Sequence, residues 1–177
     1  MKLYAVRHTK VVVNGEFFCY GFTDINVTNS FYDEAENTKN NLKDIKPDKV
    51  FTSPLSRAVK LSTYCGYATA TSDKRLMEMN FGDWEMKEWE EIMKGENSSS
   101  FLKRYINERV PNGESLNDQL SRVKDFVEEQ KKAGLESVLI FCHGGVINCL
   151  RTLAGKCNLE NAFETLPDFG SVTELEF

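Results

Sequence analysis

The sequence predicts an α/β fold: a three-layer α/β/α sandwich with a mainly parallel central sheet and a small helical insertion. Two short apolar runs, residues 3–6 and 138–141, have the length and composition of buried strands. Strand-like runs alternate with segments of helical periodicity, which is typical of parallel sheets with helical crossovers. At 177 residues the chain is long enough for one full core. We therefore expect a single domain over residues 1–177, with the insertion at about 83–110.

The N-terminal segment predicts a strand, a loop and a helix. The strand Lys2–Val6 is followed by a turn, and residues 17–24 have the mixed aromatic and polar composition of a loop beside a ligand. Residues 28–42 predict a helix because buried-type side chains recur on one stripe, at Phe31, Ala35, Thr38 and Leu42.

A second strand–helix unit follows. Lys49–Thr52 predicts a strand, and the next helix is expected to begin with Ser53 as N-cap and Pro54 at its first position. The buried face of that helix is predicted to contain Leu55, Ala58, Val59 and Ser62. Residues 68–71 predict a short third strand.

Residues 83–110 predict a helical insertion and not another strand–helix repeat. We expect the aromatic side chains in and beside it to form its core and not a substrate platform: Phe81, Trp84 and Trp89. Residues 95–100, GENSSS, predict a mobile loop, and residues 101–108 predict a short helix.

The C-terminal part predicts a long helix and two further strands. Ser115 is the expected N-cap, and Asp118 three residues later gives a weaker form of the capping box. The strand Ser137–Cys142 leads through His143 into another helix, and the alternating residues 171–177 predict a final strand.

Composition and charge narrow the class of protein. A formal net charge of −5 argues against a broad nucleic-acid surface. The N-terminal apolar run is short and broken by Arg7, unlike a signal peptide or a membrane span. The five cysteines include no CxxC pair, which favours buried free thiols over a disulfide framework. We expect a cytoplasmic protein that binds neither nucleic acid nor membrane, and a homodimer is left open.

Side chains suited to anion chemistry stand at the strand-to-helix junctions: Arg7, His8, Arg57 and His143. Parallel sheets gather such junctions at one edge, where α/β enzymes bind ligands. Arg57 lies near the positive end of a helix dipole, which is unfavourable for a cation unless an external anion binds there. The two guanidiniums, with the N–H groups of Gly144 and Gly145 at a helix start, predict a pocket for a tetrahedral dianion.

A histidine in such a pocket can attack phosphorus, and water can then hydrolyse the resulting phosphoramidate. Phosphoryl transfer needs mainly positioning and charge neutralisation, which these residues supply without a metal. Glu78 is the candidate acid for the leaving oxygen, because its apolar neighbours Met77 and Met79 predict a raised carboxyl pKa. The sequence contains no metal-ligand motif, P-loop or Rossmann fingerprint, and we expect no metal and no cofactor.

Each of these residues alone has a more ordinary interpretation. A single histidine after a strand is more often a hydrogen-bonded loop residue, and Arg57 alone is more often a surface residue. Glu78 fits a solvated turn equally well. The functional hypothesis therefore depends on all of them occurring together.

The motifs together resemble the histidine phosphatase superfamily, the phosphoglycerate mutase-like group. The matching stretches, which span nearly the whole chain, are Arg7-His8-Thr9, Ser53–Ala58, Glu78 within LMEMNFGDWE, Gly113-Glu114-Ser115 and Cys142–Gly145. The resemblance implies a phosphohistidine mechanism in which His8 is the nucleophile and Glu78 the proton donor. It also implies that Arg7, Arg57 and His143 bind the phosphoryl group, to which we add the N–H of Gly144.

Within that superfamily, the segment Cys19–Asp24 with FGDWE and NGES is similar to the α-ribazole-5′-phosphate phosphatases of cobalamin synthesis. This resemblance implies a small phosphate monoester as substrate. Beyond the phosphate we expect contacts from Asn14, Tyr20, Gly21 and Thr23. Thr9 and Lys10 depart from the family's common pattern, in which glycine and then Glu or Gln follow the Arg-His pair.

Three other functions remain open from the sequence. A broad-specificity histidine phosphatase would share these motifs. A cofactor-dependent phosphoglycerate mutase would use the same His8 but needs a closed, positively charged site for a second anion, and residues 83–95 are acidic. A non-catalytic phospholigand-binding module would be supported by the loss of an arginine, a histidine or Glu78, and this chain retains them.

Overall fold

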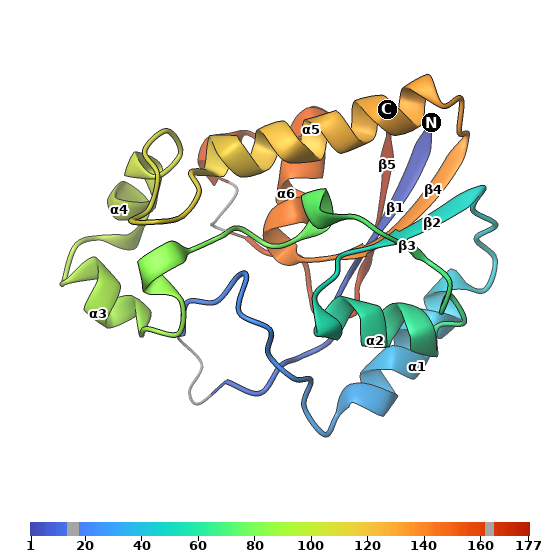
Figure 1. Cartoon of the computed structure of the whole chain (residues 1–177), viewed down its shortest axis with the longest axis horizontal. Helices are drawn as coiled ribbons and strands as arrows, with labels where there is room; N and C mark the ends of the chain where they lie inside the picture. Colours follow the sequence, from blue (N-terminus) through green and yellow to red (C-terminus); the bar gives the residue numbers. More distant parts are fainter. Residues whose placement is uncertain (14–17, 162–164) are drawn as a thin grey trace.

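The computed structural model describes residues 1–13, 18–161 and 165–177. Its centre is a five-stranded sheet in the order β3-β2-β4-β1-β5 (Figure 1). The strands in chain order are β1 (Lys2–Arg7), β2 (Lys49–Thr52), β3 (Thr71–Ser72), β4 (Ser137–Cys142) and β5 (Val172–Glu176). β1 to β4 pair in parallel, and β5 pairs antiparallel with β1. The mainly parallel sheet predicted from the sequence is therefore confirmed.

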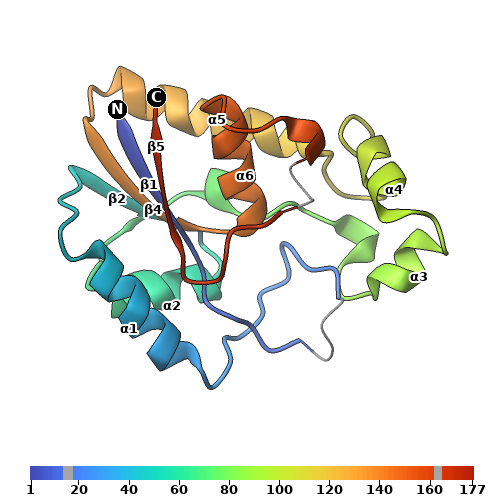
Figure 2. The same cartoon turned by 180° about the vertical axis from the view of Figure 1, so that it is seen from behind.

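Helices cover both faces of the sheet (Figures 1 and 2). α5 (Leu116–Lys132) and α6 (Gly144–Leu153) lie on one face, and α1 (Phe31–Leu42) and α2 (Ser56–Tyr64) lie on the other. Side chains alternate along each strand, so Leu3 and Ala5 pack with α5 and α6 while Val6 packs with α1 and α2. The central strands β1 and β4 are largely apolar because helices cover both of their faces. The three-layer sandwich is confirmed.

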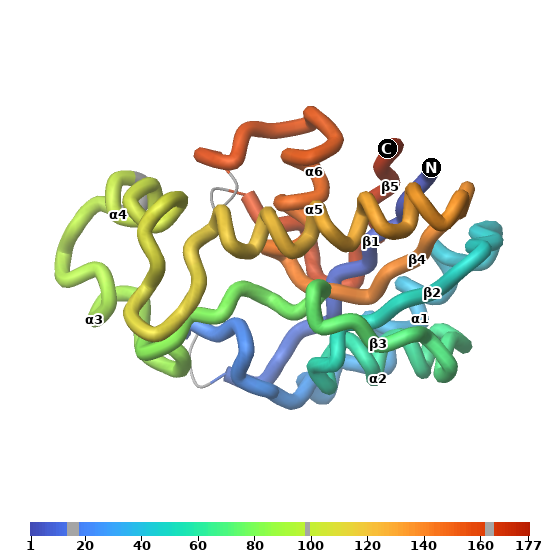
Figure 3. Tube along the Cα trace, turned by 45° about the horizontal axis from the view of Figure 1, so that its top comes forward, coloured from blue at the N-terminus to red at the C-terminus, as the bar shows by residue number. Residues whose placement is uncertain are grey.

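A helical lobe lies beyond the end of the sheet (Figure 3). It contains the short 3-10 helix η2 (Gly82–Trp84), α3 (Trp89–Met93) and α4 (Ser98–Arg104). The lobe has its own apolar core, formed by Cys19, Met79, Phe81, Trp84, Phe101 and Val110 with Trp89 packed against it. Two more 3-10 helices, η1 (Lys74–Leu76) and η3 (Leu159–Asn161), lie outside this lobe.

The pairing of β1 with β4 fixes where the two histidines lie. Arg7 is opposite Cys142 in the parallel register, and the His8 N–H donates to the Cys142 carbonyl oxygen at 3.1 Å. His8 and His143, the residues that follow the two strands, therefore leave the sheet side by side. They do so at its carboxyl edge, where ligands bind in open α/β sheets.

The start of α2 differs from the prediction. The helix begins at Ser56 with Leu55 as its N-cap residue, and not at Ser53 and Pro54. Ser53 Oγ is engaged elsewhere, with His143 Nε2 at 2.8 Å. The Asp24 carboxylate caps the helix instead, since it accepts from the Ser56 N–H at 2.9 Å and from Ser56 Oγ at 2.7 Å.

Other boundaries also shift. Residues 98–100, predicted as part of a mobile loop, form the first residues of α4, and this helix ends at Arg104 instead of 108. Burial of Phe101 in the core of the lobe accounts for the helix extending over that stretch. Val59, predicted to be buried, is 37% exposed, and Leu61 is buried in its place. α1 begins at Phe31, and β3 lies at 71–72 instead of 68–71.

The expected capping of the long helix is confirmed. Ser115 Oγ accepts from the Asp118 N–H at 3.1 Å, and the Asp118 carboxylate accepts from the Ser115 N–H at 2.9 Å. The stripe predicted for α1 is also buried along its length. Over the described part of the chain, every helix is too short or too polar to cross a bilayer.

Candidate active site

His8 is held in one tautomer directly after β1. Its Nδ1 lies 2.7 Å from the Thr9 carbonyl oxygen, which can only accept a hydrogen bond, so Nδ1 carries the ring hydrogen and Nε2 has the free lone pair. The side chain is 2% exposed. Burial, reinforced by the positive charge of Arg57, lowers the pKa of His8 to about 3. A neutral imidazole with a free Nε2 is the form that acts as a nucleophile.

His143, the N-cap residue of α6, lies beside it. The centroids of the two imidazole rings are 5.2 Å apart, with the ring planes tilted by 58°. His143 Nε2 pairs with Ser53 Oγ, while Nδ1 has no hydrogen-bond partner in the described structure. Burial and then the charge of Arg57 hold the pKa of His143 well below its usual value, so this ring is also neutral.

Arg57 is a fully buried cation. Its Nη1 donates to the Thr23 carbonyl oxygen at 2.8 Å, and its Nη2 donates to the Gly21 carbonyl oxygen at 2.6 Å. Its Nε has no hydrogen-bond partner among the described residues. Burial lowers the pKa of Arg57, since it penalises the charged form.

Arg7 is a second buried guanidinium, placed against α6. Its Nη1 donates to the Pro167 carbonyl oxygen, and the guanidinium carbon lies 3.8 Å from the centroid of the Phe169 ring. A Cβ on Gly144 would come within 3.4 Å of Arg7 Nε, so the glycine allows this close approach. Arg7 Nε, like that of Arg57, lacks a partner in the described part of the molecule.

The two guanidiniums have no carboxylate in direct contact with them in the described part of the chain. Within the described residues, neither arginine has a carboxylate oxygen at ion-pair distance, although both are at least nine-tenths buried. A buried cation without a counter-charge is costly, and an anion that accepts from the free N–H groups removes that cost. The site is therefore built for an anion with several oxygens.

Glu78 is fixed by three donors. Its carboxylate accepts from the Met79 N–H at 3.0 Å, from the Gly145 N–H at 3.1 Å and from Gln119 Nε2 at 2.9 Å. A Cβ on Gly145 would lie 2.3 Å from Glu78 Oε1, so only glycine permits this contact. We expected the Gly145 N–H to face the anion together with that of Gly144; it donates to Glu78 instead.

The loop that carries Glu78 is itself clamped to α5. Arg122 donates to the carbonyl oxygens of Arg75, Met77 and Glu78 at 2.7, 2.7 and 2.8 Å. Its remaining N–H groups form a two-point ion pair with Glu114, at 2.8 and 3.0 Å. The carboxyl group is thus positioned by both its own contacts and those of its backbone.

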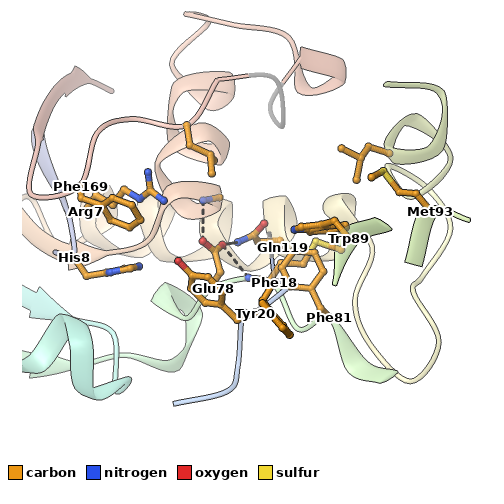
Figure 4. A pocket seen from close by; sticks show the side chains of 14 residues that line it. Arg7, His8, Phe18, Tyr20, Glu78, Phe81, Trp89, Met93, Gln119 and Phe169 are labelled. Atoms are coloured by element: carbon orange, nitrogen blue, oxygen red, sulfur yellow. Dashed lines mark hydrogen bonds between the residues drawn. The ribbon is translucent and has the colours of Figure 1, made fainter. Parts of the chain in front are cut away.

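A cavity of about 450 Å³ opens beside these groups (Figure 4). Arg7, His8 and Phe169 lie on one side of it, and Glu78 lies between them and the aromatic side chains. The other side is apolar and is contributed by the N-terminal loop and the helical lobe: Phe18, Met79, Phe81, Trp89, Met93 and Leu102. The cavity therefore has a charged end and an apolar end.

Comparison with known proteins gives the family. The model of the histidine phosphatase superfamily (branch 1) matches residues 3–177. The chain belongs to this superfamily. A relative from Hydrogenobacter thermophilus, named "Putative phosphoserine phosphatase 2", is 27% identical over 179 residues, covering 98% of this chain and 88% of the relative.

Other relatives carry a different substrate name. The adenosylcobalamin/alpha-ribazole phosphatase of Escherichia coli is 26% identical over 161 residues, which cover 85% of this chain and 77% of that enzyme. The solved structure of the alpha-ribazole phosphatase from Shigella flexneri gives a TM-score of 0.84 at 25% identity, covering 99% of this chain and 90% of the other. This histidine phosphatase superfamily member is accordingly an enzyme, a phosphatase, as the sequence predicts.

The structure brings the predicted site residues of this histidine phosphatase together in two layers. Arg7, His8, Glu78 and Tyr20 line the cavity. Arg57 and His143 are fully buried and are not among the residues that line it. The carbonyl oxygens of Gly21 and Thr23 accept from Arg57, and their expected contact with the substrate stays a prediction. Asn14 lies outside the described residues.

Several supporting residues were not identified from the sequence. Gln119 and Arg122 occupy a polar face of a predicted amphipathic helix, and nothing in their spacing distinguishes them from solvated side chains. Ser53 was interpreted as a helix cap, although it pairs with His143. One of these contacts had a signal in the sequence. Glu114 belongs to the motif Gly113-Glu114-Ser115 directly before α5, and its carboxylate accepts from Arg122.

The lowered pKa values of the histidines predict a loss of stability in acid. Both rings are neutral in the folded state, while an unfolded histidine takes up a proton below about pH 6.5. The unfolded state therefore binds more protons between about pH 6.5 and 3, and the free energy of unfolding falls as the pH is lowered through this range. Replacing His8 by glutamine removes one of the two contributions.

We expect the wild-type protein to lose about 2 kcal/mol more than His8→Gln between pH 7 and pH 5. Urea unfolding of both proteins at the two pH values measures this difference. Carboxylates change the free energy of unfolding with pH equally in both proteins. Equal losses of stability in the wild type and in His8→Gln would therefore contradict a neutral, buried His8.

Proposed function

We propose that the protein is a phosphomonoesterase that works through a phosphohistidine at His8. The observation that carries this proposal is the pair of buried guanidiniums without a carboxylate partner, next to a neutral imidazole whose Nε2 is free. A phosphate monoester supplies the missing negative charge and an electrophilic phosphorus. Its oxygens would accept from Arg7 Nε, Arg57 Nε and the Gly144 N–H.

In the first step His8 Nε2 attacks phosphorus, and the bond from phosphorus to the ester oxygen breaks. Glu78, protonated, gives its proton to the departing alkoxide. In the second step Glu78 takes a proton from water, the water oxygen bonds to phosphorus, and the phosphorus–nitrogen bond breaks. The products are an alcohol and inorganic phosphate, and His8 and Glu78 return to their starting states.

His143 would act as a neutral donor to the phosphoryl group. Ser53 Oγ accepts from the Leu55 N–H at 3.3 Å and can give its own proton to His143 Nε2. The ring hydrogen then resides on Nδ1, which has no partner in the described structure and can donate to a phosphoryl oxygen.

For the substrate we propose α-ribazole-5′-phosphate, a phosphorylated benzimidazole nucleoside. The apolar end of the cavity, with Phe18, Phe81 and Trp89, suits a flat and largely uncharged leaving group. Phosphoserine carries an ammonium and a carboxylate beyond its phosphate. The only basic and acidic side chains other than His8 among the cavity-lining residues that the structure describes are Arg7 and Glu78, which the proposed phosphoryl transfer already uses.

The same lining argues against a mutase. A phosphoglycerate mutase must hold a second anionic group, and Arg7 is the single cationic side chain among the described lining residues. We also propose that the enzyme works in the cytoplasm and without a metal or other cofactor. The thiols of Cys19, Cys65, Cys142, Cys149 and Cys157 are free, as in a reducing compartment.

Replacing the nucleophile tests the mechanism. We expect His8→Ala to abolish turnover of p-nitrophenyl phosphate and to remove an acid-labile phosphoenzyme that the wild type forms on rapid quenching. Wild-type activity is expected to survive chelation by EDTA and to be inhibited by orthovanadate. A requirement for Mg²⁺, or a phosphoenzyme that persists in His8→Ala, would contradict this mechanism.

Replacing the acid tests the role of Glu78. A general acid matters most when the departing alkoxide is a strong base. We expect Glu78→Gln to lower kcat about 10²- to 10³-fold with alkyl phosphates but less than tenfold with p-nitrophenyl phosphate. Equal losses with the two classes of ester would show that Glu78 does not protonate the leaving group.

Substrate preference tests the use of the apolar end. We expect kcat/KM for α-ribazole-5′-phosphate to exceed that for phosphoserine. Trp89→Leu is expected to lower the first value about tenfold and to leave the second nearly unchanged, because a lost aromatic contact affects only a substrate that reaches it. Tyr32→Leu, at an exposed aromatic residue on α1, is the matched control. A preference for phosphoserine would overturn the substrate assignment.

A further inference from the structure

Glu85, the residue after η2, gathers an unusual number of hydrogen bonds. Its carboxylate accepts from the N–H groups of Gly21, Phe22, Thr23 and Phe81 at 3.0, 2.9, 3.1 and 3.1 Å, and from Thr23 Oγ1 at 2.6 Å. These bonds occupy essentially the full acceptor capacity of a carboxylate. Three of the donors are consecutive backbone groups of one loop, residues 21–23.

The other side of the same loop faces Arg57. The Gly21 and Thr23 carbonyl oxygens accept from Arg57 Nη2 and Nη1. In the planar peptide group between Gly21 and Phe22, the N–H and the C=O point in opposite directions. This peptide group donates to Glu85 and accepts from Arg57, so its dipole lies between an anion and a cation and is favourably oriented toward both.

The loop is close-packed where these contacts form. A Cβ on Gly21 would lie 1.7 Å from the Met79 carbonyl oxygen, so another residue would displace the loop. The loop is also tied to the helical lobe through backbone bonds, from the Cys19 N–H to the Lys87 carbonyl oxygen and from the Met86 N–H to the Cys19 carbonyl oxygen. Those bonds do not involve the Glu85 side chain, so we expect them to remain when that side chain is changed.

We propose that Glu85 is a positioning residue for phosphate binding: it holds residues 21–23 so that Arg57 is fixed with its free Nε–H available to the phosphate. The hydrogen bonds of Glu85 in the described structure go to Phe81 and to residues 21–23, and not to Arg57 itself, so Glu85 acts on Arg57 through the loop. This inference rests on the proposed role of Arg57 as a phosphate ligand. It also makes the helical lobe part of the anion site, through a side chain that the lobe contributes.

The test is a double-mutant cycle that measures the affinity for orthovanadate by titration calorimetry. In Glu85→Gln the side-chain NH₂ group faces backbone N–H donors, so the loop loses part of its support. We expect the Kd for vanadate to rise about tenfold in Glu85→Gln. In an Arg57→Ala background, we expect the same substitution to change the Kd by less than twofold, because the residue it acts through is gone.

Asp83→Asn is the charge-matched control. Asp83 lies two residues away on η2, is exposed, and pairs with Asn112 instead of with the loop. It removes the same charge, and we expect its vanadate Kd to stay within twofold of the wild type. A rise equal to that of Glu85→Gln would show a general charge effect and would overturn the proposal.

Two further outcomes decide against the inference: an unchanged Kd in Glu85→Gln, or the same loss with and without Arg57. If Glu85→Gln does not fold, Thr23→Val removes only the Thr23 Oγ1 donor, and its expected rise of about threefold must likewise vanish in Arg57→Ala. Failure of the proposed function gives a separate signal, because Arg57→Ala alone would then leave the vanadate Kd unchanged.

Discussion

The arrangement of the molecule follows from two buried guanidiniums without a carboxylate beside them. A fold that buries Arg7 and Arg57 must satisfy their N–H groups, and backbone carbonyl oxygens of Gly21, Thr23 and Pro167 do so only in part. The remaining N–H groups of these two cations define an anion site. Burial, together with the same positive charge, keeps both neighbouring histidines neutral, so one requirement accounts for both the proposed binding groups and the proposed nucleophile.

The sheet positions the two histidines of this site, and a loop outside the sheet positions Glu78. The parallel register of β1 and β4 places His8 and His143 next to each other, and no flexible segment intervenes. Glu78 comes from outside the sheet, so its position depends on side-chain contacts with α5 and on the close approach of Gly145. The groups proposed to act on phosphorus are thus carried by, or held against, helices and strands.

The sequence predicts the sheet and the reacting groups because both leave local signals. Strands buried on two faces appear as apolar runs, and a histidine or arginine directly after such a run must lie at the carboxyl edge. The supporting contacts of Gln119, Arg122 and Glu85 leave no such signal, because a polar residue on a helix or loop looks the same whether it faces water or a distant backbone group. The start of α2 could not be predicted either, since Asp24, distant in the sequence, caps the helix, while Ser53, the locally preferred cap, pairs with His143.

The two ends of the cavity are formed by different parts of the fold. One superfamily can therefore include relatives named for phosphoserine and for α-ribazole, both at similar identity to this chain. The end proposed to bind phosphate depends on strand register and buried charge, so a change there is expected to remove the activity. The far end is lined by apolar side chains of the helical lobe, whose core is separate from that of the sheet. Substitutions in the lobe can therefore alter the leaving group that fits without disturbing Arg7 or His8. Glu85 is an exception among the residues of the lobe, because its carboxylate holds the loop that contacts Arg57. A substitution there would therefore also affect the anion site.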